Sequence, residues 1–412
     1  MNQEIYDWQL ASFLHREIDK LPMNQQAQLK SLRYCGRKIV RPTYGPDGVY
    51  VLSNHEESKL FGLTMCKNPF ACPCCSAHRM GIYSAQIAVA LDEMRKRGYF
   101  GFMMTLTIPH LSFMSCREIT DCLYETYSYF RRTMKQKNYR KTKRTGTASH
   151  QFFVDVQIAH SVTVCEYTHG QNGWHPHFHA ILWIPKSNVD KVLKWQSELN
   201  EFWLYTAQRI MKKHFSKCEH TITNLFKYAE PDAGVIFSTN SDGSLSESLS
   251  SEYICGWGAN REVTGNYRKM ASNAGHRTPY QILEDAYNGD AASRDLYIDY
   301  CLAVTLKPVH HRVIWSRTGI KAIVIQAQQV QRAEEYLKKK DAAEWKVLCW
   351  FDRLQWACIF DYNAPTIANI LWIAAHAPKL LYDFLDGLNL KYHMPEENYF
   401  TRHVEQMYNM SA

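Results

Sequence analysis

The segment GWHPHFHAILWI, residues 173–184, places three histidines at alternate positions directly before an apolar run. Successive side chains of a β-strand point to opposite faces, so His177 and His179 share one face while Phe178 takes the other. His175 joins the same face if the strand extends back across the intervening proline. Two imidazoles on one face lie roughly 7 Å apart along the strand and can converge on one divalent cation. The alternative is a pair of polar residues on a solvated strand face, and the third histidine and the apolar run favour the metal site over it.

The residues before this segment predict its partner strand. Residues 152–170 and 174–185 are expected to form two strands around the turn GQNG, in which the Asn-Gly pair is a strong hairpin signal. Glu166 and His169 lie just before the turn and are further candidate ligands. Imidazoles with a carboxylate suit Mg²⁺, Mn²⁺ or a similar ion that polarises a phosphate. A change of one residue in the register would turn Glu166 to the other face, so the strand pairing decides whether it can bind.

Hydrophobic periodicity predicts the other elements. The run FGFMMTLTIP, residues 100–109, carries Thr105 and Thr107 and is expected to be a buried strand ended by its proline. Residues 1–60 are expected to hold a helix and then a loop, and the serine-rich segment 238–251 predicts an exposed loop. Helical spacing recurs at 80–98, 117–134, 187–214, 252–257, 279–303 and 321–357.

The composition predicts a globular chain of two or three domains. Its 412 residues are 46% hydrophobic and 13% aromatic, enough for sizeable cores. The formal net charge of +8 favours polyanionic partners such as nucleic acid. The amphipathic N-terminus lacks a secretory signal pattern, and no apolar run reaches roughly 20 residues, so we expect a cytoplasmic protein with no membrane partner. The 13 cysteines are then expected to be reduced.

A cluster of cysteines predicts a zinc site. The segment CKNPFACPCC, residues 66–75, contains a C-x-x-C pair at the spacing that a tight turn presents to one zinc ion. A different interpretation is that these cysteines are buried small apolar side chains. Within the zinc interpretation, Cys74 and His78 are alternatives to Cys35 as the fourth ligand. A structural zinc site takes four protein ligands, and those expected here are Cys35, Cys66, Cys72 and Cys75.

A basic segment predicts contacts with nucleic acid. Residues 131–146, RRTMKQKNYRKTKRTG, contain eight lysines and arginines and no acid. Such a run binds phosphates by releasing counterions, independent of base sequence, and Tyr139 within it can stack on a base. The alternative is a solvated helix end and loop. The candidate DNA-binding residues are Arg131, Arg132, Lys135, Lys137, Arg140, Lys141, Lys143 and Arg144.

Four segments together resemble a known family. GWHPHFHAILW resembles the His-hydrophobic-His motif of HUH endonucleases, in particular the replication initiators of rolling-circle plasmids. FMMTLTIP resembles the first motif of that family, SEYICGWGANREVTGNYRK its tyrosine segment, and HHRVIWSRTGIK the motif that follows. The motifs occur in family order, and the resemblance covers roughly residues 60–320. Many relatives also carry a C…CPxC element before the first motif, which agrees with the expected zinc site.

The resemblance implies a tyrosine nucleophile that attacks single-stranded origin DNA, remains joined to the 5′ phosphate and leaves a 3′-OH to prime synthesis. The matching residue is Tyr253, with Tyr228 and Tyr267 as alternatives. Family members commonly carry a lysine three residues after the tyrosine, where this chain has Gly256. The cations considered as replacements are Lys227, Arg261 and Lys269. The acids near the tyrosine that are considered for activating a terminating water are Glu247 and Glu252.

We therefore expect an α/β (α+β) chain with a central antiparallel sheet of about five strands and flanking helices, the HUH endonuclease fold. A zinc-bound helix and loop region (1–80) precedes this endonuclease domain (81–320), and a helical region (321–412) follows it. The expected function is Mg²⁺- or Mn²⁺-dependent nicking and strand transfer at a plasmid origin, through a covalent 5′-phosphotyrosine. The resemblance adds a host helicase and DNA polymerase as partners. The alternatives are a transposase or relaxase of the same chemistry, and a zinc-dependent DNA-binding protein without catalysis.

Overall fold

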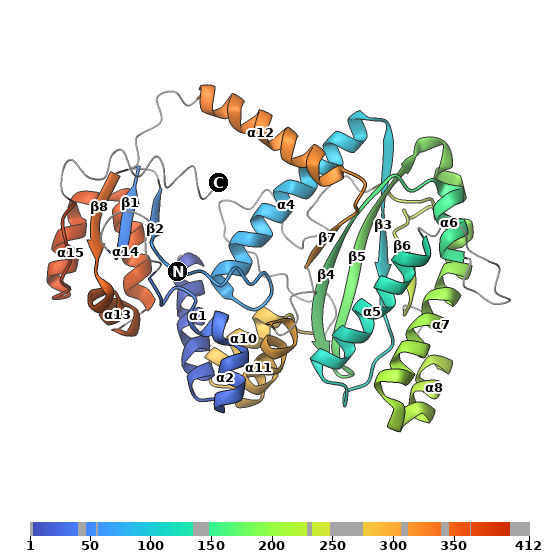
Figure 1. Cartoon of the computed structure of the whole chain (residues 1–412), viewed down its shortest axis with the longest axis horizontal. Coiled ribbons are helices and arrows are strands. Elements are labelled where there is room, and N and C mark those ends of the chain that lie inside the picture. Colours follow the sequence, from blue (N-terminus) through green and yellow to red (C-terminus); the bar gives the residue numbers. More distant parts are fainter. Residues whose placement is uncertain are drawn as a thin grey trace. The chain divides into compact units, whose positions relative to one another are not determined.

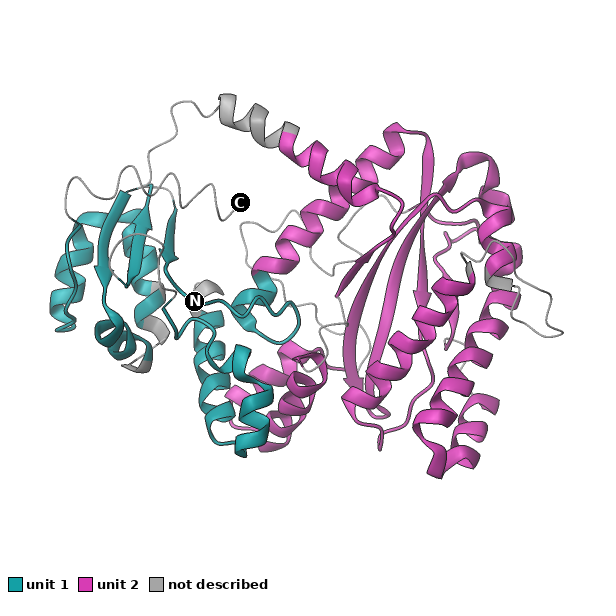
Figure 2. Ribbon diagram, viewed as in Figure 1, with its two compact units in different colours: residues 1–77, 334–412 teal, residues 78–333 magenta. Residues whose placement is uncertain are grey.

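The computed structural model divides the chain into two compact units (Figure 2). Unit 1 comprises residues 1–77 and 334–412, and unit 2 comprises residues 78–333. None of the helices in the described part of the chain is long and apolar enough to cross a membrane. The structure describes residues 3–39, 47–54, 57–134, 148–228, 233–247, 275–305, 312–338, 346–362 and 364–395.

Unit 2 is built on a five-stranded antiparallel sheet (Figure 1). Its strands are β3 (Tyr99–Leu106), β4 (His160–Gly170), β5 (Gly173–Pro185), β6 (Val235–Phe237) and β7 (Val313–Trp315). The strand order is β6-β3-β5-β4-β7, so β5, which carries the histidines, is the central strand. The expected mixed fold with an antiparallel sheet of about five strands is confirmed.

The register of β5 with its two neighbours determines which side chains meet. Glu166 of β4 lies directly opposite His177 of β5. On the other side of β5, Thr105 of β3 lies opposite His179. Directly opposite residues of antiparallel strands project to the same face of the sheet. Three adjacent strands thus place a carboxylate, two imidazoles and a hydroxyl on one face.

Helices pack on both faces of this sheet (Figure 1). The helices of this part of the chain are α4 (Pro73–Lys96), α5 (Cys116–Met134), α6 (Ala148–Val156), η1 (Lys186–Lys191), η2 (Leu193–Trp195), α7 (Gln196–His214), η3 (Ser216–Cys218), α8 (Glu219–Lys227), α10 (Pro279–Tyr287), α11 (Ala291–Thr305) and α12 (Ile320–Lys338). The face with the histidines continues through Ile181 and Trp183 into a core shared with α4 and α12. The opposite face packs on α5, where the ring of Tyr127 lies 4.6 Å from that of Phe178.

Unit 1 contains a second antiparallel sheet, of order β2-β1-β8. Its strands are β1 (Val49–Ser53), β2 (Ser58–Phe61) and β8 (Lys346–Phe351), and its helices are α1 (Gln3–Asp19), α2 (Met23–Gln28), α3 (Lys30–Arg33), α13 (Arg353–Tyr362), α14 (Ala364–His376), η4 (Pro378–Leu380) and α15 (Leu381–Gly387). Its core joins residues from both ends of the chain, among them Trp8, Val51 and Trp356. The division expected from the sequence, at residues 80 and 320, separates these two ends, whereas in the structure they share one sheet.

Several described elements differ from the sequence-based expectations, and three of them have a clear reason. Residues 152–156, expected to begin a strand, end helix α6 instead, because a short apolar run suits a buried helix as well as a buried strand. Strand β8 interrupts the helix expected at 321–357, since KVLCWF pairs with β1 and buries Cys349 and Phe351. Strand β1 lies in the region 1–60, where only a helix and a loop were expected.

Candidate metal centres

Glu166, His177 and His179 bring three metal-ligating atoms together on one face of the sheet of unit 2. The carboxylate oxygen and the two ring nitrogens all lie within 4.8 Å of one another. Glu166 Oε2 is 3.6 Å from Nε2 of each histidine. Between 10% and 12% of each side chain is exposed, so the group is largely shielded from water.

The spacing of these atoms fits a shared divalent cation. Metal–ligand bonds of about 2.1 Å place neighbouring ligand atoms roughly 3.0–3.4 Å apart, which is close to the separation of 3.6 Å found here. A mixed set of imidazoles and a carboxylate suits ions between the hard and soft extremes, such as Mn²⁺ or Zn²⁺. Three protein ligands leave coordination positions for water or substrate, as in catalytic metal sites.

Each imidazole of this group is also held at its second ring nitrogen. Thr105 Oγ1 lies 3.0 Å from Nδ1 of His179. The carbonyl oxygen of His175 lies 3.3 Å from Nδ1 of His177. With Nδ1 engaged in this way, Nε2 of both rings faces Glu166. The contact of Thr105 was not expected from the sequence, because it depends on the register between β3 and β5.

The other candidate histidines lie beside the ligand group and outside it. The ring of His175 packs against those of His177 and His110, at centroid distances of 5.2 Å and 4.9 Å. Burial, and then the neighbouring His177, lower the pKa of His175 to about 2, and burial also lowers the pKa of His110. His169 packs on Trp174, and burial lowers its pKa as well. These rings are therefore neutral at pH 7 and add no positive charge that would oppose a bound cation.

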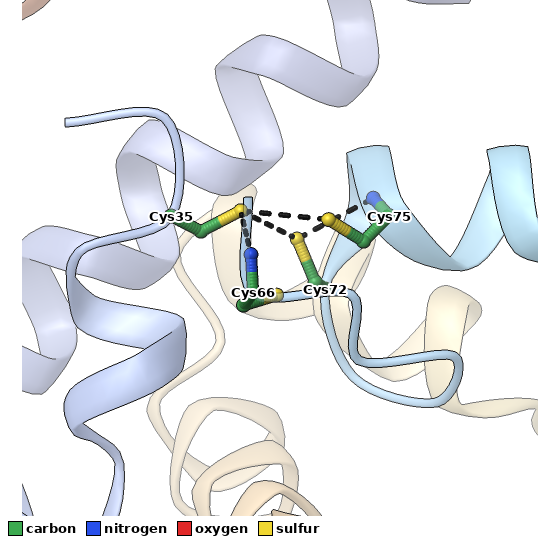
Figure 3. Close-up of side chains that lie close together, drawn as sticks. All are labelled: Cys35, Cys66, Cys72 and Cys75. Atoms are coloured by element: carbon green, nitrogen blue, oxygen red, sulfur yellow. Dashed lines mark hydrogen bonds between the residues drawn. The ribbon is translucent and has the colours of Figure 1, made fainter. Parts of the chain in front are cut away.

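Four cysteines in unit 1 form the second group (Figure 3). Cys35 Sγ is 3.6 Å from Sγ of both Cys72 and Cys75, which is far beyond the roughly 2.05 Å of a disulfide. A zinc ion with Zn–S bonds of about 2.3 Å in a tetrahedron separates its sulfurs by roughly 3.8 Å. The structure thus brings together the four cysteines named from the sequence, Cys35, Cys66, Cys72 and Cys75, with all four sulfurs within 4.8 Å of one another.

Backbone groups hold these sulfurs in place. Cys72 directly precedes α4 and Cys75 lies in its first turn, so the backbone N–H of Cys75 donates to Sγ of Cys72 at 3.5 Å. The backbone N–H of Cys66 donates to Sγ of Cys35 at 3.3 Å (Figure 3). Hydrogen bonds from N–H groups favour the charged form of a ligand and fix its orientation. The loop and the helix start therefore prepare thiolates for a metal.

The neighbouring sulfurs shift the pKa values of these thiols in opposite directions. Hydrogen bonding from Cys35 lowers the pKa of Cys75, whereas the same neighbour raises the pKa of Cys72 well above its usual value. The neighbouring sulfurs therefore oppose joint ionisation of the group, and a bound metal ion would supply the positive charge that stabilises four thiolates. The two alternative ligands lie outside the group: Cys74 packs on the core of unit 1, and His78 is exposed.

The expected nucleophile, Tyr253, lies outside the described residues. The same holds for Glu252, Gly256, Arg261, Tyr267 and Lys269. Of the alternatives that are described, Tyr228 is 73% exposed, and its ring lies 5.2 Å from Nζ of Lys227. Glu247 forms an isolated bridge with Phe102 of β3.

Two of the eight basic residues of this segment are described, at the end of α5. Arg131 lies over the ring of Tyr127, at 5.5 Å from its centroid. Arg132 and Arg209 both lie over Tyr129, at 5.3 Å and 4.7 Å. Aromatic faces thus support the guanidinium groups at this helix end. The other six, which lie outside the described residues, are Lys135, Lys137, Arg140, Lys141, Lys143 and Arg144.

No match to this chain is found among protein-family models, curated proteins or solved structures. The function is therefore inferred from the two ligand groups and the sequence motifs. The cysteine group joins Cys35 to a segment about 30 residues later, the second group lies on one hairpin, and each has the number of ligands that a particular kind of metal site requires.

Proposed function

We propose that this chain is an HUH endonuclease that nicks and rejoins single-stranded DNA at a replication origin. The observation that carries the proposal is the group of Glu166, His177 and His179 on the central strand β5 and its neighbour β4 in a five-stranded antiparallel sheet. The HUH resemblance calls for two histidines on one strand that bind a cation next to a phosphate. The opposite placement of Glu166 and His177 supplies a third ligand for that cation.

In the proposed reaction, the phenolic oxygen of Tyr253 attacks the scissile phosphorus. A P–O bond to the tyrosine forms, the P–O3′ bond breaks, and the leaving 3′ oxygen takes up a proton to become a 3′-OH. A phenol with a pKa near 10 is a weak nucleophile at pH 7. A cation held by Glu166, His177 and His179 would withdraw charge from the phosphate oxygens and lower the barrier without an exceptional base. The phosphotyrosine retains the bond energy, so the reverse reaction joins strands.

The cysteine group is proposed to hold a structural zinc ion. Four protein sulfurs complete a tetrahedral shell and leave no position for substrate. The role assigned to it is to hold the segment around Cys35 and the segment around Cys66 against the start of α4. The basic segment from Arg131 is proposed to contact DNA phosphates, with origin DNA as the partner.

Formation of a covalent adduct with DNA tests the proposal. The full chain is incubated with Mn²⁺ and single-stranded oligonucleotides from its own replicon, and SDS-resistant adducts are resolved by gel electrophoresis. Tyr253→Phe is expected to abolish the adduct, whereas Tyr228→Phe and Tyr267→Phe retain it. His177→Ala is expected to lower adduct formation by about 100-fold or more. His160→Ala, at the other end of β4 from Glu166, is the matched histidine control.

Each outcome of this experiment has a distinct meaning. Mass spectrometry of the peptide attached to DNA names the nucleophile directly, and a peptide without Tyr253 would show that the assignment is wrong. Undiminished cleavage by the His177→Ala variant would refute the metal site. DNA binding without any adduct would favour the zinc-dependent binding protein, and a substrate from a mobile element in place of a plasmid origin would favour the transposase or relaxase.

A further inference from the structure

The ring of His179 has a partner on the neighbouring strand that no motif assigns. Thr105 lies directly opposite His179 in the pairing of β3 with β5. Its Oγ1 is 3.0 Å from Nδ1 of the ring, within hydrogen-bonding distance. Only 8% of His179 is exposed, so water competes little for this contact. The hydroxyl is therefore a fixed part of the surroundings of the imidazole.

The two histidines of the group differ in how their second nitrogen is engaged. His177 faces the carbonyl oxygen of His175, which only accepts, so the tautomer that this contact favours donates from Nδ1 and leaves Nε2 for a cation. His179 faces a hydroxyl, which can donate or accept. Its tautomer therefore depends on what binds Nε2. With a cation at Nε2, Nδ1–H donates to Thr105 Oγ1.

We infer that Thr105 is the positioning residue of the metal site. Its hydroxyl accepts the proton of His179 Nδ1 and holds the ring with the Nε2 lone pair directed to the cation. Partners of this kind fix the tautomer and orientation of a metal-bound histidine, and their loss lowers metal affinity roughly 10- to 100-fold. The inference rests on the metal site of the proposed function and adds a residue to it.

The second threonine of the same strand end has a different partner. Thr107 Oγ1 accepts a hydrogen bond from the backbone N–H of Gly234 at 2.8 Å, directly before β6. The two threonines of the segment TLT are thus separated in role: Thr107 holds an edge of the sheet, and Thr105 serves the metal group. The preference of threonine for β-strands therefore does not explain the contact between Thr105 and His179.

Mn²⁺ binding by four proteins tests this inference: the full-length wild type, Thr105→Val, Thr105→Ser and Thr163→Val. Valine keeps the shape of threonine and removes the hydroxyl, whereas serine retains it. Thr163 is the matched control, because it lies on β4 and its hydroxyl bonds Tyr127 on the opposite face of the sheet. Thermal unfolding of each variant verifies that it is folded.

The expected result is an Mn²⁺ dissociation constant about tenfold higher for Thr105→Val, and within about twofold of the wild type for Thr105→Ser and Thr163→Val. Nitrogen-15 spectra of histidine-labelled protein with a diamagnetic ion, Zn²⁺, are expected to show His179 with a protonated Nδ1, and a mixture of tautomers in Thr105→Val. Equal Mn²⁺ affinity in wild type and Thr105→Val overturns this inference alone. Absence of Mn²⁺ binding by the wild type overturns the proposed metal site itself.

Discussion

The two ligand groups of this chain differ in their ligands, their supports and their remaining coordination positions. The cysteine group of unit 1 has four ligands drawn from a short helix end, a loop and the start of α4. The group of unit 2 has three ligands on two adjacent strands of a sheet. A closed shell of sulfurs stabilises the fold around it, whereas an open shell on a rigid sheet can bind a substrate oxygen.

This difference leads to opposite expectations for removal of each metal. The segments that carry Cys35 and Cys66 are joined by two backbone hydrogen bonds, from Gly36 N–H to Thr64 O and from Thr64 N–H to Lys38 O, and the proposed zinc ion would add a further link between them. His177 and His179 lie on a strand that is paired on both sides, so their positions do not depend on a cation. Loss of the proposed zinc ion should therefore destabilise unit 1. Loss of the cation proposed for unit 2 should abolish DNA nicking without destabilising the fold.

The largest expected effect is that of Cys72→Ser. The variant should lose about one equivalent of zinc and lower the melting temperature of unit 1 by roughly 10 °C or more, because binding of a structural zinc contributes roughly 10–16 kcal/mol in small domains. Elemental analysis and calorimetry measure the two effects. Cys74→Ser, whose side chain is outside the group, should retain the zinc. Full zinc content in Cys72→Ser would refute the tetrahedral site.

The second prediction concerns His177→Ala. Mn²⁺ affinity should fall by about 100-fold, which is about 2.7 kcal/mol, because the remaining two ligands hold the ion weakly. The melting temperature should change by less than about 2 °C. Titration calorimetry and thermal unfolding measure these quantities. A large loss of stability with unchanged Mn²⁺ affinity would show that His177 has a structural role and does not bind the cation.

A third prediction contrasts two buried imidazoles, one in each unit. His15 in unit 1 stacks on Phe360, and burial, followed by Arg37, lowers its pKa to about 3 against the opposing charge of Asp19. Its folded pKa is below the unfolded value of about 6.5, so the folded state binds fewer protons and stability falls as the pH drops below 6.5. We expect His15 to lower the free energy of unfolding of unit 1 by about 2 kcal/mol between pH 6.5 and pH 4.5.

Replacement of His15 measures this contribution. Calorimetry of His15→Gln should show a smaller loss of stability over this pH interval than the wild type, whereas His220→Gln, an exposed control in unit 2, should behave like the wild type. An unchanged pH dependence in His15→Gln would show that other groups cause the loss.

The smallest expected effect is that of Arg132→Ala on DNA binding. Arg132 is exposed at the end of α5, so its removal should weaken binding to any single strand and reduce the slope of log K against log salt by about 0.7, the value for one lost phosphate contact. Fluorescence anisotropy at several salt concentrations measures the slope. Arg353→Ala, an exposed arginine of unit 1, is the control. An unchanged slope would remove Arg132 from the DNA interface.

Local patterns were sufficient to predict a large part of the fold. Alternation along residues 173–184 predicted that His177 and His179 share a face, and the Asn-Gly turn predicted the hairpin. The C-x-x-C spacing predicted that the sulfurs of Cys72 and Cys75 lie close together. These signals are reliable because they depend on the geometry of a few consecutive residues, which does not change with tertiary packing.

Contacts between distant segments could not be predicted in the same way. The composition of KVLCWF allows a helix or a strand, and only pairing with β1 makes it strand β8. The partner of His179 at Nδ1 depends on the register of β3 against β5, and a shift by one residue would turn Thr105 away. The residues alone thus specified which side chains are candidate metal ligands, whereas packing across the sheets specified which atoms hold them in position. The physical reason is that ligand chemistry belongs to each side chain, but strand register is set by burial of whole faces.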